Sequence, residues 1–155
     1  MHAAYFRPGG VAQDLPFKLY DEISLFISKF VNFIDDMEVL LTNNRIWKQR
    51  LVSVGAVSLL NSFNWGFSGV MVRGSGLKLD LRVNNSYEIY DMLKFKVPIG
   101  SYGDCYDRYL IRVSEMRESL SIMKQCLDIL AFPNLSSSLD IKSKNFKYVA
   151  PKRAD

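Results

Sequence analysis

The chain has 155 residues, 48% of them hydrophobic and 23% charged, a balance typical of one folded domain that excludes a disordered or fibrous protein. Its formal net charge of +4 comes from 20 basic residues dispersed along the sequence, so nucleic-acid binding is not indicated. No apolar run approaches the roughly 18 residues that a membrane-spanning helix needs. The two cysteines, Cys105 and Cys126, are too few and too far apart to hold a metal by themselves.

The first residues fit neither a secretory signal nor an import presequence. Arg7-Pro8-Gly9-Gly10 predicts a turn, because proline biases the preceding residue away from helix and glycine permits the next bend. Because this turn motif lies within the first ten residues, with no leading segment before it, we expect the chain to begin in the middle of a larger fold.

A long helix is expected from Asp14 to Thr42, with Asp14 as its N-cap. Its apolar residues recur at spacings of three and four and form one stripe, which consists of Leu19, Ile23, Phe26, Phe30, Phe33, Met37 and Leu41. Further apolar residues widen the stripe until little polar surface remains. A helix of this kind is normally buried on most sides, so we expect it to pack against other chains. Arg45 to Arg50 predicts a short basic helical turn after it.

A glycine-rich stretch from Gly66 to Gly76 follows a short helix predicted at Ser58 to Asn64. One interpretation is a tight connection between helices; the other is a loop that approaches a cofactor or a partner, with Arg73 as its fixed positive charge. The stretch is not a phosphate-binding loop, because a lysine and a hydroxyl residue do not directly follow its last glycine. We expect Gly74 and Gly76 to require positive φ angles.

A strand is predicted at 94–98, where Phe95 and Val97 alternate with lysines before Pro98 ends the pattern. The second long helix is expected to begin after Asp104 and continue to Pro133. Its apolar residues also recur at spacings of three and four and form a stripe, which consists of Tyr106, Leu110, Val113, Met116, Leu120, Met123, Leu127 and Leu130. Asp104 is predicted to be its N-cap, and Asp107 an acidic variant of the capping box. Along its surface we expect two ion pairs, Asp104 with Arg108 and Arg112 with Glu115. Residues 131–147 are predicted to be a surface linker.

Six motifs in one order connect these elements to a known family. They are residues 1–11 (MHAAYFRPGGV), 41–47 (LTNNRIW), 64–71 (NWGFSGVM), 73–76 (RGSG), 103–110 (GDCYDRYL) and 151–154 (PKRA). Together they resemble the hydrogenase-like large peripheral-arm subunit of respiratory complex I, in its mitochondrial and related bacterial form rather than its chloroplast form. Several ordered motifs are far more specific than any single glycine pattern.

The resemblance implies an α+β, mainly helical fold. It would be the middle part of a nickel-iron hydrogenase large-subunit-like fold, in which a small strand region and glycine-rich loops lie between two long buried helices. Residues 1–155 would then form a single incomplete domain, completed by chains that carry the missing amino- and carboxy-terminal parts of the subunit.

The resemblance also implies a function: passing electrons from NADH through iron-sulfur clusters to ubiquinone, coupled to proton translocation. No cofactor would bind this chain directly. The terminal 4Fe-4S cluster would be held by a neighbouring subunit, with His2 and Arg7 beside it. Gly9, Gly10, Arg73, Gly74 and Gly76 would form structural loops.

No residue of this chain matches the family's quinone-binding residues, and no metal ligand or catalytic residue is implied. The nickel-ligating cysteine pairs of hydrogenases have no counterpart here. The implied location is the matrix-side peripheral arm at the mitochondrial inner membrane, or the cytoplasmic face of the membrane in a bacterium, with membrane contact only through the complex.

Two alternatives belong to other classes. The first is a free-standing binding or structural module, whose glycine loops and basic helix hold an acidic partner; such a module should fold alone. The second is a member of a related chloroplast-type or membrane-hydrogenase complex, for which NADH would be a poor electron donor.

Overall fold

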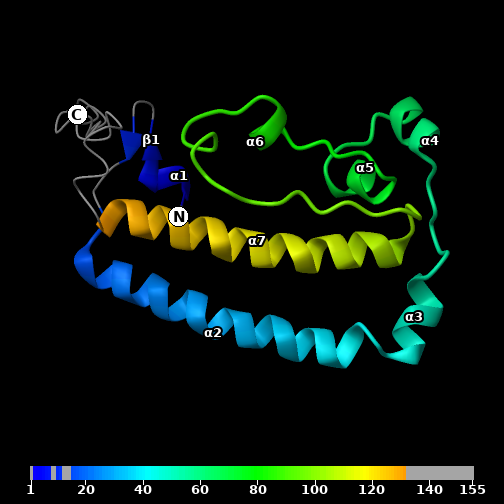
Figure 1. Ribbon diagram of the computed structural model, residues 1–155, viewed down its shortest axis with the longest axis horizontal. Helices are drawn as coiled ribbons and strands as arrows, with labels where there is room; N and C mark the ends of the chain where they lie inside the picture. The colour runs from blue at the N-terminus through cyan, green and yellow to red at the C-terminus, as the bar shows by residue number, and fades with distance from the viewer. Residues whose placement is uncertain (1, 8–9, 12–14, 132–155) are drawn as a thin grey trace, which may run out of the picture. The chain divides into compact units, whose positions relative to one another are not determined.

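The computed structural model describes residues 2–7, 10–11 and 15–131, and these are mainly helical, as predicted. The described residues divide into two units: one consists of those up to residue 25 together with 126–131, and the other spans 26–125. The elements in chain order are α1 (His2–Tyr5), β1 (Phe6–Arg7), β2 (Gly10–Val11), α2 (Phe17–Leu41), α3 (Arg45–Leu51), α4 (Leu59–Asn64), α5 (Val70–Gly74), α6 (Leu81–Asn84) and α7 (Cys105–Ala131) (Figure 1).

The core of the 26–125 unit lies between α2 and α7, which run antiparallel and side by side in Figure 1. Ile34 of α2 and Val113 and Leu120 of α7 are its buried centre. Partly buried apolar side chains surround them: Ile27, Phe30, Tyr109, Met116 and Met123. The three- and four-residue spacing predicted from the sequence therefore supplies one packed face on each helix.

Polar contacts fix how α2 and its following turn sit on α7. Arg117 pairs with Asp35 at 2.7 Å and also with Glu38, both on α2. The Tyr106 hydroxyl donates to the Thr42 carbonyl oxygen at 2.9 Å. Because these bonds join residues more than sixty positions apart, they set the register of the helix pair as well as its contact.

The outer side of α2 is exposed, so the 26–125 unit alone does not bury this helix on most sides. Phe33 and Leu40 expose 54% and 69% of their surface. The apolar stripe is wider than the area that α7 covers, because a single neighbouring helix contacts only one narrow face. That other chains cover the remainder stays a prediction at this point.

The starts of α3 and α4 agree with the sequence prediction, whereas α5 and α6 were not predicted. Asn44 caps α3, its side-chain oxygen accepting from the backbone N–H of Ile46 at 2.9 Å. Ser58 caps α4 through the N–H of Asn61 at 3.3 Å. Short polar side chains at these positions satisfy amides that have no partner within the helix. The predicted cap Asp14 lies outside the described residues.

Residues 94–98 do not form a strand, so the strand prediction for this segment was wrong. The segment runs along α7 and bonds to side chains of that helix. Gln125 accepts from the Lys94 N–H at 2.9 Å and donates to the Lys94 carbonyl at 2.7 Å, and Glu118 accepts from the Lys96 N–H at 2.9 Å. Alternation of apolar and polar residues indicates an extended backbone with one buried side. A sheet also needs a neighbouring strand, and here side chains of α7 bond to the backbone groups that such a strand would bond.

The strands of the described residues are β1 and β2, which pair antiparallel with Phe6 opposite Val11 and Arg7 opposite Gly10. This pairing agrees with the turn predicted at residues 7–10, although Pro8 and Gly9 themselves lie outside the described residues. Within the described part of the chain, no helix has the length and apolar character needed to cross a membrane.

Candidate functional site

The glycine-rich stretch lies at the start of α7, where three segments meet. We call this place the loop junction and define it as residues 53–57, 73–76 and 99–104. Its backbone bonds are Gly100 N–H to the Arg73 carbonyl at 2.9 Å, Gly103 N–H to the Gly74 carbonyl at 3.0 Å, and Val57 N–H to the Gly103 carbonyl at 3.1 Å. The loops therefore satisfy backbone groups of one another, including those of the buried Gly74 and Gly103.

Asp104 ties the junction to α7. One carboxylate oxygen accepts from the N–H of Asp107 at 2.8 Å, which confirms the predicted N-cap, and the other accepts from the N–H of Ser53 at 2.8 Å. The residue is only 3% exposed. A single buried carboxylate thus caps the helix and holds the first segment of the junction against it.

Asp107 and Arg108 do not make the contacts predicted for them. Asp107 accepts from the N–H groups of Ser101 and Tyr102, each at 2.7 Å, rather than closing a capping box. Arg108 donates to the carbonyls of Gly103 at 2.7 Å and Gly55 at 2.8 Å, and not to Asp104. The folded loops bring unsatisfied backbone groups within reach, and short-range spacing along a helix cannot reveal them.

The glycines of the junction differ in what they require. Gly76 has φ +99°, as predicted, whereas Gly74 is helical, and the expectation of a positive φ there was wrong. A Cβ at Gly74 would lie 3.2 Å from the Arg108 Cγ, so close packing is its constraint. The most restrictive position is Gly103, which combines φ +66° with a Cβ position 2.4 Å from the Val57 carbonyl oxygen.

Arg73 is buried and pairs with Glu115 of α7, and it also donates to the Leu79 carbonyl at 3.1 Å. The second Glu115 oxygen accepts from Arg112 at 2.9 Å, which confirms the predicted Arg112 pair. The Arg73 guanidinium is therefore neutralised inside the chain, while its Nε–H is buried without a partner. This geometry favours the interpretation of the stretch as a tight connection held onto α7.

A second ion pair stands just after the stretch. The Asp80 carboxylate accepts two bonds from the Arg82 guanidinium, at 3.0 and 2.7 Å, and one from the Arg82 N–H at 3.0 Å. The Arg82 guanidinium carbon also lies 4.8 Å from the Phe95 ring centroid. Hydrogen bonding from Arg82 lowers the pKa of Asp80 below its ordinary value of 3.8.

The Asp80 pKa gives a prediction for acid stability. Because the folded-state pKa is depressed, the ion pair stabilises the fold above the unfolded pKa, and that contribution is lost as pH falls through the folded pKa. Asp80→Asn should lower the unfolding free energy at neutral pH, and its difference from the unmodified chain should shrink below about pH 4. Protease resistance in urea, with pepsin on the acid side, measures this. A difference that does not change with pH would contradict the assignment.

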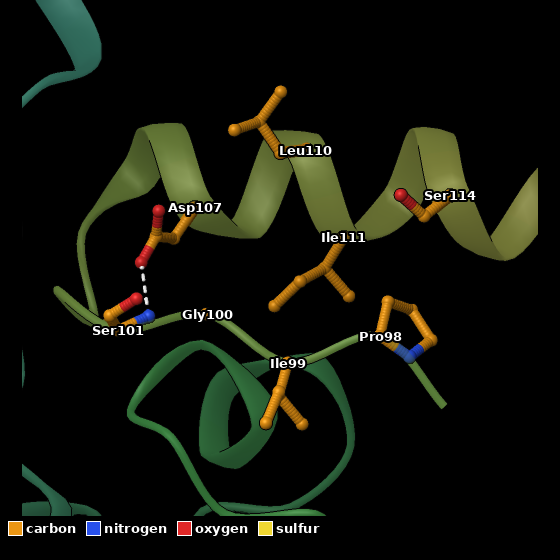
Figure 2. Close-up of a pocket in the computed structure, with 8 residues that line it drawn as sticks. All are labelled: Pro98, Ile99, Gly100, Ser101, Asp107, Leu110, Ile111 and Ser114. Carbon is orange, nitrogen blue, oxygen red and sulfur yellow. Dashed lines mark hydrogen bonds between the residues drawn. The ribbon is translucent and has the colours of Figure 1, made fainter. Parts of the chain in front are cut away.

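A pocket beside the junction has a volume of about 260 Å³ and lies between the 98–101 segment and the first turns of α7 (Figure 2). Its lining is Pro98, Ile99, Gly100, Ser101, Asp107, Leu110, Ile111 and Ser114. Figure 2 shows the Asp107 carboxylate bonded to the Ser101 amide at one end. That carboxylate is engaged in holding the loop, and the other polar side chains of the lining are the hydroxyls of Ser101 and Ser114, so the lining offers no free base to activate a nucleophile.

For the residues near the amino terminus to which the sequence analysis gave a role, the structure describes the backbone of His2, Arg7 and Gly10. His2 begins α1, Arg7 ends β1, and Gly10 of β2 pairs with Arg7. Gly9 lies outside the described residues, as does the predicted 131–147 linker beyond Ala131. The roles expected for His2 and Arg7 thus remain predictions.

Metal-ligand chemistry can be judged on the donor set of the described residues. No cluster of three or more His, Cys, Asp or Glu side chains there could hold a metal ion. The Cys105 sulfur accepts from Arg108 at 3.1 Å, and burial raises the pKa of the Cys126 thiol. The described residues thus do not fit the ligand set of an iron-sulfur cluster, which takes several thiolates.

The chain is thus mainly helical, and its glycine-containing loops are bonded to the long helix α7. Among the described residues we find no constellation of catalytic groups. The family model for the 49 Kd subunit of respiratory-chain NADH dehydrogenase matches residues 1–155. The chain belongs to this family, and the resemblance based on the six motifs is confirmed.

Individual relatives agree with the family match. The chain is 54% identical over 154 residues to an NADH-quinone oxidoreductase subunit of Mesorhizobium japonicum, covering 99% of the chain and 38% of the relative. It is 59% identical over 130 residues to NADH dehydrogenase [ubiquinone] iron-sulfur protein 2 of Nephroselmis olivacea, covering 84% and 33%. For the NADH-quinone oxidoreductase subunit of Agrobacterium fabrum the identity is 54% over 155 residues, covering 100% and 39%. The chain thus spans less than two fifths of the length of these relatives.

Proposed function

We propose that this chain is part of the peripheral arm of respiratory complex I, which oxidises NADH and reduces a quinone with coupled proton translocation. The observation that carries the proposal is the family match across residues 1–155. Identities of 54–59% to subunits named for NADH and quinone oxidoreduction support the same function. The chain would act within the complex and would not catalyse the reaction alone.

The proposal extends to fold and location. The chain would supply the middle of a hydrogenase-like subunit, completed by chains that carry its other parts. It would lie on the matrix side of the mitochondrial inner membrane, or on the cytoplasmic face of a bacterial membrane. Subunits of the peripheral arm would be its partners, above all the one that holds the terminal 4Fe-4S cluster.

The loop junction would serve this function by fixing geometry. Electron transfer between cofactors in different subunits depends on how rigidly the surrounding chains are held, and a site on a packed support is more precise than one on a free loop. Asp104, Arg73 and Arg108 each bind a loop to α7 through internal contacts. In this proposal the junction is a support on which partner chains assemble.

His2 and Arg7 would lie beside the terminal cluster. When bound in its own subunit, that cluster would accept and pass on one electron at a time. An imidazole titrates near about 6.5 when unperturbed, so His2 is suited to take up a proton when negative charge is added nearby. The fixed charge of Arg7 would favour the reduced state without titrating, because a guanidinium stays protonated.

Replacing His2 with methionine should remove most of the pH dependence of the terminal cluster's midpoint potential. A proton taken up with each electron gives a slope of about 59 mV per pH unit, and the methionine thioether cannot take up that proton. Redox titration of the cluster's paramagnetic signal at several pH values measures the slope.

The matched variant for this prediction is Arg7→Gln. Loss of a fixed positive charge should lower the midpoint potential at every pH and leave the slope in place. An unchanged slope in His2→Met would remove His2 from the proposed role, and a changed slope in Arg7→Gln would contradict the fixed-charge role of Arg7.

The experiment that tests the function itself is depletion of this chain in its own cell. NADH:quinone reductase activity of the membranes should fall with the chain, while succinate:quinone reductase activity, which shares the quinone pool, should be retained. Retention of both activities would contradict the proposal. If NADH oxidation is unaffected but another reductant is no longer used, the chloroplast-type or hydrogenase-type alternative applies instead.

A further inference from the structure

The α6 helix ends in two adjacent asparagines whose surroundings differ. Asn84 is the last residue of α6 and Asn85 is its C-cap, and both are exposed. The Asn84 side-chain oxygen accepts from the Asp80 N–H at 3.1 Å, so this amide is held against the start of the helix. The Asn85 side chain has no hydrogen bond to any described residue. The pair thus offers one restrained amide and one free amide in the same short segment.

The backbone nitrogens that follow the two asparagines differ in the same way. The Asn85 N–H donates to the Leu81 carbonyl at 3.0 Å, whereas the exposed Ser86 N–H has no partner in the part of the chain that the structure describes. An exposed N–H without a protein partner bonds to water. Before a backbone nitrogen can react with the preceding side chain, it must turn toward it and lose its proton. The Ser86 nitrogen is free to do so, and the Asn85 nitrogen is not.

We propose that Asn85 is a site of spontaneous deamidation. The Ser86 backbone nitrogen attacks the Asn85 Cγ and forms a C–N bond. The bond from Cγ to Nδ2 breaks, and the proton of the Ser86 N–H leaves with the departing ammonia. Water then opens the succinimide ring at one of its two carbonyls, which gives aspartate or isoaspartate. No electrons are transferred, and water is the only co-reactant.

The local backbone permits this attack. Asn85 has φ −133° and ψ 70°, outside the helical region. Rotation about its Cα–C bond brings the Ser86 nitrogen toward Cγ, and no hydrogen bond of the Ser86 N–H opposes that rotation. The Ser86 side chain is small and unbranched at Cβ, so it leaves the nitrogen accessible.

The other asparagines among the described residues lack this combination. The N–H that follows the asparagine is bonded to a carbonyl or lies within a helix at Asn32, Asn43, Asn61, Asn64 and Asn84. Asn44 uses its side-chain oxygen to cap α3, and a large arginine follows it. The geometry therefore selects one asparagine for the reaction.

Deamidation at Asn85 changes both the charge and the backbone. Each event adds one carboxylate to a chain whose formal net charge is +4, and isoaspartate also adds a methylene to the main chain. The new negative charge lies at the carboxyl end of α6, where helix carbonyls already carry partial negative charge. Aged copies of the chain would thus carry an isoaspartyl carboxylate, the substrate of protein isoaspartate methyltransferases.

Peptide mapping of the native assembly that contains the full chain tests the proposal. The assembly is incubated at mildly alkaline pH, and samples are denatured and cut with trypsin over time. Cleavage after Arg82 and Lys94 leaves Asn84 and Asn85 in one peptide. Electron-transfer fragmentation then assigns each deamidation and distinguishes isoaspartate from aspartate. Asn84 is the internal control, and a chain kept in urea during the incubation gives both rates without the fold.

We expect the ratio of deamidation at Asn85 to that at Asn84 to be several-fold larger in the native assembly than in urea. Ser86→Val should slow the reaction at Asn85 and leave Asn84 unchanged, because a β-branched side chain shields the attacking nitrogen. Equal ratios in the two conditions, an Asn85 that stays intact in the native assembly, or an unchanged rate in Ser86→Val would each overturn the proposal. The inference does not rest on the proposed function, so none of these outcomes bears on that function.

Discussion

Gly103→Ala is expected to prevent the chain from accumulating in its folded form. The new Cβ would lie 2.4 Å from the Val57 carbonyl oxygen, closer than real Cβ contacts come, and φ +66° is unfavourable for alanine as well. The clashing atom is backbone, and Val57 N–H is bonded to the Gly103 carbonyl, so neither side can move without breaking the junction. We expect a loss of more than about 3 kcal/mol, a large share of the stability of an ordinary domain.

Gly66→Ala is the matched control for this substitution. Gly66 has the same φ of +66°, but a Cβ there would meet no atom within 4 Å. The difference between the two variants thus isolates the clash from the backbone strain, which alone costs about 1–2 kcal/mol. The amount of chain retained in the assembled complex, and its protease resistance in urea, measure both. Equal retention and equal protease resistance of the two variants would show that the backbone around Gly103 shifts to accommodate the Cβ, which would contradict the prediction.

Arg73→Met is expected to produce the second large loss, about 3–5 kcal/mol, because removal of one partner leaves a mostly buried Glu115 carboxylate poorly compensated. Methionine keeps much of the length of the side chain, so the change falls mainly on the charge and its hydrogen bonds. The donor to the Leu79 carbonyl is lost as well, which frees the segment that follows the glycine-rich stretch. The same urea and protease measurement applies.

Two further variants define what the Arg73 loss means. Arg112→Met removes the exposed partner of the same carboxylate, 63% exposed, and should cost less than about 1 kcal/mol. Arg73→Met combined with Glu115→Leu removes both buried charges and should be more stable than Arg73→Met alone, because an apolar pair can replace a buried ion pair. If Arg112→Met costs as much as Arg73→Met, the pair does not have the buried character described here.

Most of the helical frame could be predicted from residue spacing and capping chemistry. The α7 helix follows its apolar stripe, and Asp104 caps it, because both signals are local and independent of the rest of the fold. The 94–98 segment could not be assigned correctly in this way. Its alternation indicates an extended backbone, but only the fold shows that Gln125 and Glu118 of α7, not a strand, receive its amides.

Within the loop junction, the sequence identified the glycine-rich stretch but not its tightest positions. Gly100 and Gly103 lie outside the four-glycine cluster, yet a Cβ at Gly100 would lie 2.7 Å from the Asp107 carboxylate. Such constraints come from chain segments that meet only in the fold. The one local signal that could have pointed to these positions was the presence of glycines just before a predicted helix and its N-cap.

The expected roles of His2 and Arg7 depend on the family resemblance and not on spacing. A single histidine has many structural uses, and only the motif around it suggested a redox-linked proton site. Arg73 shows the opposite case: its charge suggested a cofactor or a partner, and the fold pairs it with Glu115 instead. Charge in a sequence indicates that a partner is needed, but not where that partner lies.

The central claim is that this chain works as a part of complex I, and one measurement tests it most directly. Detergent-solubilised membranes are separated on a native gel, stained for NADH oxidation, and the active band is searched by mass spectrometry for peptides of this chain. We expect the chain in a very large active band, beside peptides that match the rest of the family's subunit. Migration of the chain alone, as a small species absent from that band, would contradict the claim.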